Sequence, residues 1–302
     1  MTAELAIELQ GVQKRFGRVP VLRGIDLRVQ RGEFLGLVGP NGAGKSTILR
    51  ILIGLYRRSE GRCLVFSLDP DHDALTIRAR TSYLPGETSV YQQMTGESFL
   101  RFAQSFHRGR DREVEQRLVE LFALPLQARV RSYSAGMKQK LAILAALSVE
   151  ADLYVLDEPD RALDATMRME VRDVLRDLHR AGKTLLLSSH HLEELQALTT
   201  RLAFLRSGEI IAASEIEAAR TKLHRRFRLR LSRDVALPGG AVCRSRETDG
   251  TMVLEVDGPP AAFLQALPAD AIASAQLGSA RLEDLYELLF LHGPSATDGA
   301  LS

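Results

Sequence analysis

Cysteine is scarce in this sequence, and its scarcity excludes two common ways of building a small protein. The 302 residues include two cysteines, Cys63 and Cys243, which lie far apart. A disulfide framework needs several cysteines and a zinc cluster needs closely spaced ones, so the sequence indicates neither. Isolated thiols of this kind are typical of a reducing cytoplasm.

Long apolar runs are also missing, as is the pattern of a secretory signal. The longest apolar stretch, Leu141–Leu147, is much shorter than the roughly 18 residues that a membrane-spanning helix needs. The start, MTAELAIELQ, has neither a basic region nor a long apolar core. We therefore expect that, if a membrane is involved, another chain spans it.

Neither sign of charge is in excess. The 40 basic and 38 acidic side chains nearly cancel, so the overall balance gives no reason to expect nucleic acid as a partner. One local exception is the row formed by Arg226, Arg228 and Arg230, which alternates with apolar residues. A period of two places these charges on one face of a strand, and we expect a solvated strand face there rather than a patch for nucleic acid or lipid headgroups.

The chain is long enough for one large domain and a smaller one. From Glu8 to Gly208, short apolar runs such as FLGLV and LYVLD alternate with amphipathic helical patterns, which indicates an α/β core with a parallel sheet covered on both faces. Ahead of this pattern, LAIELQGVQKRF and VLRGIDLRV favour an antiparallel hairpin. Residues 95–131 predict a helical insertion.

The pattern changes after Ser214. RRFRLRLS and TMVLEV read as strands, whereas PAAFLQAL and RLEDLYELLF read as amphipathic helices. The sequence therefore predicts a first domain over 5–214, a small C-terminal α+β domain over 215–292 and a flexible tail over 293–302.

The segment GPNGAGKS, Gly39–Ser46, matches the pattern G-x-x-x-x-G-K-[ST] between a predicted strand and a predicted helix. Glycines let backbone N–H groups turn toward an anion, and the start of a helix adds its positive end. Lys45 can reach the β- and γ-phosphates, and the hydroxyl of Ser46 can ligate Mg²⁺. The alternative is a glycine-rich turn without a ligand. We predict a nucleoside triphosphate site formed by Gly39, Pro40, Asn41, Gly42, Ala43, Gly44, Lys45, Ser46 and Thr47.

Two carboxylates end a second apolar strand, LYVLDEP, at Leu153–Pro159. Asp157 can hold Mg²⁺, and Glu158 can act as the general base that polarises the attacking water. Taken alone, the pair could instead begin a helix, because acidic side chains favour helix N-termini.

Between these motifs, the segment SYSAGMKQKL resembles the signature motif of the ATP-binding cassette (ABC) ATPases. The family motif is Leu-Ser-Gly-Gly-Gln, and this chain has Tyr133-Ser134-Ala135-Gly136-Met137. The resemblance spans about Ile7 to Gly208 and implies a P-loop NTPase core with an antiparallel β subdomain and an α-helical subdomain. It also implies that Ser134, Ala135 and Gly136 meet the γ-phosphate of ATP bound to the opposite subunit. The same serine also reads as a helix cap.

The resemblance assigns roles to three further positions. Phe16 occupies the place of the aromatic ring that stacks on adenine, although a single phenylalanine could equally belong to the core. His190 matches the switch histidine that contacts the γ-phosphate, whereas a lone histidine after a strand is more often structural. Asp164 matches the aspartate of the loop that meets the partner subunit.

Two departures from the family pattern stand out. The family carries glutamine where this chain has Gly86, in Tyr83-Leu84-Pro85-Gly86-Glu87. Because glycine has no side chain, the link between the nucleotide and a membrane partner must use Glu87, backbone groups or ordered water. The loop after the acidic strand, Thr-Ser-Gly-Leu-Asp in the family, is Asp160-Arg161-Ala162-Leu163-Asp164 here.

The resemblance implies an ATPase subunit that uses ATP and Mg²⁺ and forms a head-to-tail dimer with a second ATPase subunit, a homodimer. It implies work on transmembrane permease subunits from the cytoplasmic face of the cell membrane, with residues 89–99 as the docking segment. The C-terminal region resembles that of exporters of drugs, antibiotics and lipids, which favours export. In this family the membrane chains select the transported substrate.

Three other functions are compatible with part of the sequence pattern. A soluble ABC-type ATPase with a regulatory role is the main alternative, and a cassette that binds ATP without hydrolysing it is another. A P-loop GTPase or kinase would leave the signature motif unexplained, and the sequence has no Asn-Lys-x-Asp guanine motif. The presence of Lys45, Asp157, Glu158 and His190 together favours hydrolysis.

Overall fold

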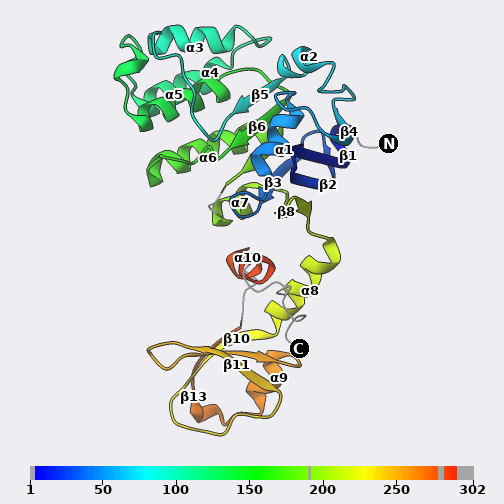
Figure 1. Ribbon diagram of the computed structural model, residues 1–302. Helices are drawn as coiled ribbons and strands as arrows, with labels where there is room; N and C mark the ends of the chain where they lie inside the picture. The colour runs from blue at the N-terminus through cyan, green and yellow to red at the C-terminus, as the bar shows by residue number, and fades with distance from the viewer. Residues whose placement is uncertain (1–3, 190–191, 278–281, 291–302) are drawn as a thin grey trace. The chain divides into compact units, whose positions relative to one another are not determined.

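The computed structural model describes residues 4–189, 192–277 and 282–290. The chain forms two compact units, Met1–Ile210 and Ile211–Ser302 (Figure 1). Each unit has its own sheet and its own apolar core.

A six-stranded sheet forms the centre of the first unit, in the order β5-β6-β7-β3-β8-β9. The strands are β3 (Phe34–Val38), β5 (Thr81–Leu84), β6 (Leu153–Asp157), β7 (Thr184–Ser188), β8 (Arg201–Arg206) and β9 (Glu209–Ile210). All neighbours are parallel except β8 and β9. Every residue of β3, β6 and β7 is buried, as expected for strands covered on both faces.

The register of this sheet brings the ends of three strands together. Ser188 of β7 pairs with Leu37 of β3 on one side and with Asp157 of β6 on the other. The loops that follow these strands therefore leave the same edge of the sheet, which is where open parallel sheets bind their ligands.

The predicted antiparallel hairpin is confirmed. β1 (Leu5–Phe16) pairs with β2 (Val19–Gln30), and the order of this second sheet is β2-β1-β4. The third strand, β4 (Glu60–Val65), follows the first helix and pairs with the other edge of β1. Ile7 and Ile25 of this sheet pack in one buried cluster with Leu35 of the central sheet.

The predicted helical insertion is also confirmed, and local capping explains where its helices begin. In Figure 1, α3, α4 and α5 gather at one end of the first unit. Thr95 and Asp111 accept hydrogen bonds from the first turns of α3 and α4, which satisfies donors that have no partner within the helix. The helices of this unit are α1 (Lys45–Leu52), α2 (Ala74–Arg78), α3 (Gly96–Gln104), α4 (Arg112–Phe122), η1 (Val130–Ser132), α5 (Ala135–Leu147), α6 (Ala165–Arg180) and α7 (Leu192–Leu198).

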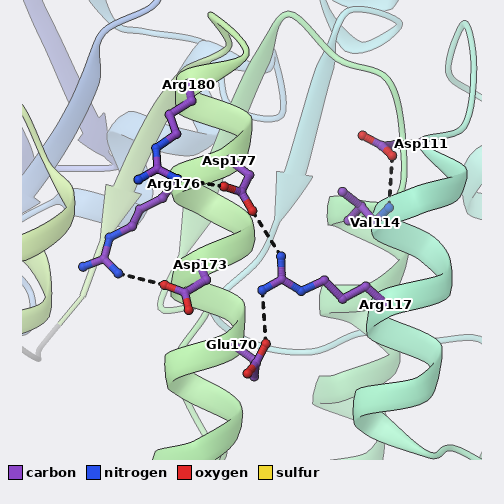
Figure 2. Close-up of polar contacts among 8 residues, drawn as sticks. All are labelled: Asp111, Val114, Arg117, Glu170, Asp173, Arg176, Asp177 and Arg180. Atoms are coloured by element: carbon purple, nitrogen blue, oxygen red, sulfur yellow. Dashed lines mark hydrogen bonds and ion pairs between the residues drawn. The ribbon is translucent and has the colours of Figure 1, made fainter.

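An arginine links the helical insertion to the core. Arg117 of α4 contacts Glu170 and Asp177 of α6, each at 3.1 Å (Figure 2). These pairs are partly exposed, so each contributes at most about 1 kcal/mol to stability. Because one guanidinium contacts two carboxylates of α6, the pairs favour one orientation of α4 against α6.

The second unit is the α+β arrangement that its sequence pattern predicts. Its antiparallel sheet has the order β11-β12-β10-β13. Its elements are α8 (Ala213–His224), β10 (Arg226–Leu231), β11 (Ala241–Arg246), β12 (Met252–Val256), α9 (Pro260–Gln265), η2 (Ala269–Ala271), β13 (Ile272–Leu277) and α10 (Leu282–Phe290). Phe227, Leu229, Leu254 and Phe263 are buried together and form its core.

The arginine row of β10 lies on the side of the strand opposite this core. Arg226 pairs with Glu255 at 2.9 Å, and the exposed Arg228 and Arg230 lie 3.5 and 3.8 Å from carboxylates of Glu247 and Asp249. The predicted charged strand face is confirmed, and nearby acids balance its charge. Within the described residues, no helix has both the length and the apolar character that crossing a bilayer requires.

Candidate nucleotide-binding site

The loop of Gly39–Gly44 connects β3 to α1, as its sequence predicts. Gly39 is packed so closely that an added Cβ would lie 2.3 Å from the carbonyl oxygen of Leu205. Gly42 and Gly44 have φ of +78° and +110°, a region that side chains other than glycine rarely adopt. The glycines are therefore required by space at one position and by backbone conformation at two others.

The N-terminus of α1 faces the end of this loop. Gly44 is the N-cap residue, and it has no side chain to satisfy the amides of the first helical turn. Helix geometry leaves the first N–H groups without partners inside the helix, and the dipole adds partial positive charge there. Ser46 and Thr47 are half-buried in this turn, beside those amides. Such a terminus is suited to bind phosphate.

The ammonium of Lys45 lies across the loop. Its Nζ donates to the carbonyl oxygens of Gly39 at 2.6 Å and Pro40 at 3.1 Å, and the residue is 6% exposed. Burial lowers the pKa of Lys45, whereas the negative charges of Glu158 and Asp157 oppose that shift. The cation of Lys45 thus lies near the carboxylates of Asp157 and Glu158 at the end of β6.

Asp157 ends β6 and is 2% exposed. Its Oδ1 accepts a hydrogen bond from the hydroxyl of Ser188 at 2.5 Å. Glu158 follows with φ of +53°, and its amide donates to the carbonyl oxygen of Ser188 at 3.0 Å. A residue other than glycine in this conformation costs roughly 1–3 kcal/mol, and such strain is typical of functional sites.

The alternative in which these two acids begin a helix is wrong. The next helix, α6, begins at Ala165, and its N-cap is Asp164, which accepts from the amide of Met167 at 2.9 Å. Asp157 and Glu158 therefore serve no capping role for this helix.

The signature segment begins α5. Ser134 is the N-cap, and its hydroxyl accepts from the amide of Met137 at 3.2 Å. Ser134 and Ala135 are exposed, and no acidic residue lies in the first turn of α5. A Cβ on Gly136 would lie 3.8 Å from the carbonyl oxygen of Ala162. The serine is a helix cap, and the helix end that it caps remains accessible from outside.

Phe16 lies at the end of β1, and the residue is 44% exposed. It packs edge-on against Tyr56, with ring centroids 5.3 Å apart, and the ammonium of Lys14 lies 4.8 Å from its centroid. An exposed ring of this kind is not part of the core, so the core alternative is wrong.

Gly86 lies just after β5, against the acidic strand. A Cβ on Gly86 would be 3.2 Å from Oδ2 of Asp157. Its carbonyl oxygen accepts from Nη1 of Arg161 at 3.1 Å. The residue before Arg161, the buried Asp160, accepts a hydrogen bond from the hydroxyl of Ser189 at 2.5 Å.

Comparison with known proteins decides the family. A family model described as ABC transporter matches residues 22–161. The daunorubicin resistance ATP-binding protein DrrA3 of Streptomyces coeruleorubidus is 38% identical over 224 residues, which cover 72% of this chain and 71% of that protein. This chain belongs to the ABC transporter ATP-binding proteins.

Solved structures agree with this assignment. The chain resembles a solved ATP-binding subunit of an ABC transporter with a TM-score of 0.65 and 28% identity, over 72% of this chain and 93% of that one. It also resembles a dimeric ATP-binding cassette in a post-hydrolysis state with ADP and Pi, with a TM-score of 0.60 and 23% identity, over 68% and 97% of the two chains. At that identity, the second likeness shows the fold alone. The expected ABC ATPase fold is confirmed.

Membership gives this ABC protein its activity: it is an ATPase whose hydrolysis of ATP powers transport. The donor set at the strand ends also suits Mg²⁺, which proteins usually hold through one or two carboxylates together with the phosphates of the substrate. The hydroxyl of Ser46 and the buried carboxylate of Asp157 are hard oxygen donors of this type.

His190 lies outside the described residues, as does the predicted tail over 293–302. The sequence motifs assigned no role at this candidate site to three polar side chains, Ser188, Ser189 and Arg161. Their types carry no motif of their own, because serine and arginine are common in loops and at strand ends. The pairing of β6 with β7 brings Ser188 to Asp157 and Ser189 to Asp160, and the pairing of β5 with β6 brings Gly86 within reach of Arg161.

Proposed function

We propose that this chain is the ATP-hydrolysing subunit of an exporter and that it works on separate transmembrane permease subunits. The observation that carries this proposal is the convergence of the buried Lys45, the α1 terminus and the strand-end acids at one edge of the central sheet. A relative named for daunorubicin resistance supports export, because removing a drug from the cell is one way to resist it.

Each side chain has a role in this proposal. Residues 39–47 wrap the phosphates through backbone amides, and Lys45 neutralises their charge. Ser46 and Asp157 hold Mg²⁺, and Glu158 accepts the proton of the attacking water. His190 contacts the γ-phosphate, and the exposed ring of Phe16 stacks on adenine.

The proposed complex contains a second copy of this ATPase. Ser134, Ala135 and Gly136 meet the γ-phosphate on the partner's loop, so each nucleotide lies between two subunits. The exposure of Ser134 and Ala135, at a helix end free of acidic residues, supports this arrangement. ATP then stabilises the closed dimer through contacts that hydrolysis removes.

Residues 89–99 are the proposed docking segment for the permease. Tyr91 is 59% exposed, and its ring lies 5.3 Å from that of Phe102, which in turn lies 4.9 Å from that of the exposed Phe106. An exposed aromatic row is typical of protein interaction sites. Docking there places this subunit on the cytoplasmic face of the membrane, held by the permease.

The domain division belongs to the same proposal. Residues 5–214 form the ATPase domain, and residues 215–292 form an accessory domain of the kind that exporter subunits carry.

Purification of the chain from native membranes tests the proposal. We expect a membrane-spanning permease to co-purify and to raise the rate of ATP hydrolysis. The variant Tyr91→Ala, inside the docking segment, should weaken co-purification while hydrolysis by the isolated chain stays unchanged. Robust hydrolysis by a chain that is recovered without any membrane protein would support the regulatory alternative instead.

A further inference from the structure

Gly86 lies against the carboxylate that we assign to Mg²⁺. A Cβ added to Gly86 would be 3.2 Å from Oδ2 and 3.3 Å from Cγ of Asp157, which is tighter than ordinary packing. Gly86 is not among the glycines with positive φ, so its backbone conformation does not demand glycine. The close approach to Asp157 is what favours a residue without a side chain here.

Two neighbouring segments line the carboxylate of Asp157. Ser188 of β7 donates to its Oδ1 at 2.5 Å, and Gly86 follows β5 on the side of Oδ2, where a side chain would crowd the carboxylate. A shift of the Gly86 segment therefore changes the space that Oδ2 can occupy. The position of the Gly86 segment thus decides how firmly the carboxylate is oriented.

Arg161 holds that segment in place. Its Nη1 donates to the carbonyl oxygen of Gly86 at 3.1 Å, across 75 residues of sequence. The amide of Arg161 donates to the carbonyl oxygen of Glu158 at 3.2 Å, so the arginine is itself fastened to the acidic motif.

Asp160, which precedes Arg161, makes a similar contact to the segment that follows β7. Asp160 accepts from the hydroxyl of Ser189, which directly follows β7. Because β6 lies between β5 and β7 in the sheet, Asp160 and Arg161 fasten one loop to the segments that follow both neighbours of the acidic strand.

We infer that Arg161 is a positioning residue for ATP hydrolysis, because it holds Gly86 against Asp157 and so orients the carboxylate that binds Mg²⁺. This role rests on the ATP hydrolysis proposed above. Arg161 touches neither nucleotide nor metal in this scheme. It acts through the backbone carbonyl of Gly86, because glycine has no side chain that could contact Asp157 or Mg²⁺.

The test compares MgATP hydrolysis by the full-length wild-type chain, Arg161→Ala, Arg161→Lys and Gly86→Gln. Arg161→Ala should lower kcat by about tenfold and raise the Mg²⁺ concentration for half-maximal rate, because a small misplacement of a reacting group is costly. Affinity for ATP without metal should be unchanged. Arg161→Lys keeps a donor and should recover most of the rate. Arg180→Ala removes an exposed arginine of α6 and serves as the control.

A double variant probes the link between the two residues. Gly86→Gln alone should lower kcat, because its Cβ crowds Asp157. Gly86→Gln combined with Arg161→Ala should be more active than the product of the two single losses, since the released segment can shift by a few tenths of an ångström to fit the side chain. Additive losses would overturn the inference.

The remaining outcomes are also decisive. If wild type hydrolyses ATP and Arg161→Ala leaves kcat and the Mg²⁺ dependence unchanged, Arg161 has no positioning role, although the proposed function stands. If wild type does not hydrolyse ATP even with its permease, the proposed function itself fails. Should Arg161→Ala unfold at a lower temperature than wild type, Arg161→Met keeps the aliphatic stem without the donor and gives the same test.

Discussion

The ammonium of Lys45 donates to the carbonyl oxygen of Gly39 at 2.6 Å, so the cation of the phosphate loop is held by the backbone of the residue that begins the loop. The contact keeps a buried charge solvated by carbonyl dipoles. It also places the charge where the phosphates are proposed to bind, so little reorganisation is needed when they arrive.

Replacing Lys45 with alanine should nearly abolish ATP binding. Without the ammonium of Lys45, the charge of the bound phosphates has no cation beside it, which costs about 3 kcal/mol and corresponds to about a 100-fold weaker affinity. Titration with a fluorescent ATP analogue measures the change, and Lys222→Ala on the exposed face of α8 is the control. Tight nucleotide binding by Lys45→Ala would contradict the role of this lysine.

Replacing Glu158 with glutamine should separate binding from hydrolysis. The amide keeps the shape of the side chain but cannot accept a proton, so we expect hydrolysis to fall by about 10²- to 10⁴-fold. ATP binding should persist, and the variant should accumulate as an ATP-bound dimer in size-exclusion chromatography. Turnover at the wild-type rate would exclude Glu158 as the general base.

Acid should destabilise the protein partly through Asp69. The guanidinium of Arg58 donates to both of its oxygens, at 2.8 and 2.7 Å, and lowers the pKa of Asp69 to about 2. Because the folded-state pKa lies below the unfolded value, this stabilisation is present in full above the unfolded pKa and is lost as pH falls through the folded one.

The difference in unfolding free energy between wild type and Asp69→Asn therefore measures this pair. We expect wild type to be more stable by roughly 1–2 kcal/mol at pH 6, less than the pKa shift alone would give, because the pair is partly exposed and screened. Urea titrations between pH 6 and pH 3 should show the difference shrinking. Asp173→Asn, in a more exposed pair on α6, should show a smaller change. A difference independent of pH would contradict the prediction.

The two cysteines should differ in reactivity. Cys63 is buried in β4, and burial raises the pKa of its thiol to about 12, whereas Cys243 is exposed. Since the thiolate is the reactive form, a thiol reagent at pH 8 should modify Cys243 and spare Cys63 in the native protein. Unfolding in urea should expose both thiols. Native modification of a Cys243→Ser variant at the unfolded rate would contradict this prediction.

Much of the site could be predicted from the sequence because its signals are local. A glycine-rich turn between a strand and a helix places backbone amides and one lysine within a few residues, and a serine cap fixes the start of α5. The strand that ends in Asp157 and Glu158 is readable from its unbroken apolar run. In each case the chain within one turn or one strand determines the geometry.

The contacts that orient those acids could not be predicted. Ser188, Ser189 and Arg161 carry no motif, and each reaches its partner through strand order rather than through sequence distance. The pairing of β4 with β1 could not be predicted either, because the short β4 has mostly exposed residues at its start and shows no clear alternation of apolar and polar residues.

The sequence by itself determined which chemistry we propose for this chain: a loop for phosphates, carboxylates for a metal and a water, and a helix end for the neighbouring subunit. Only the tertiary structure decided that Gly86 packs against Asp157 and that Arg161 holds it there. The physical reason is that motifs are set by local backbone geometry, whereas the order and register of parallel strands depend on packing the whole core.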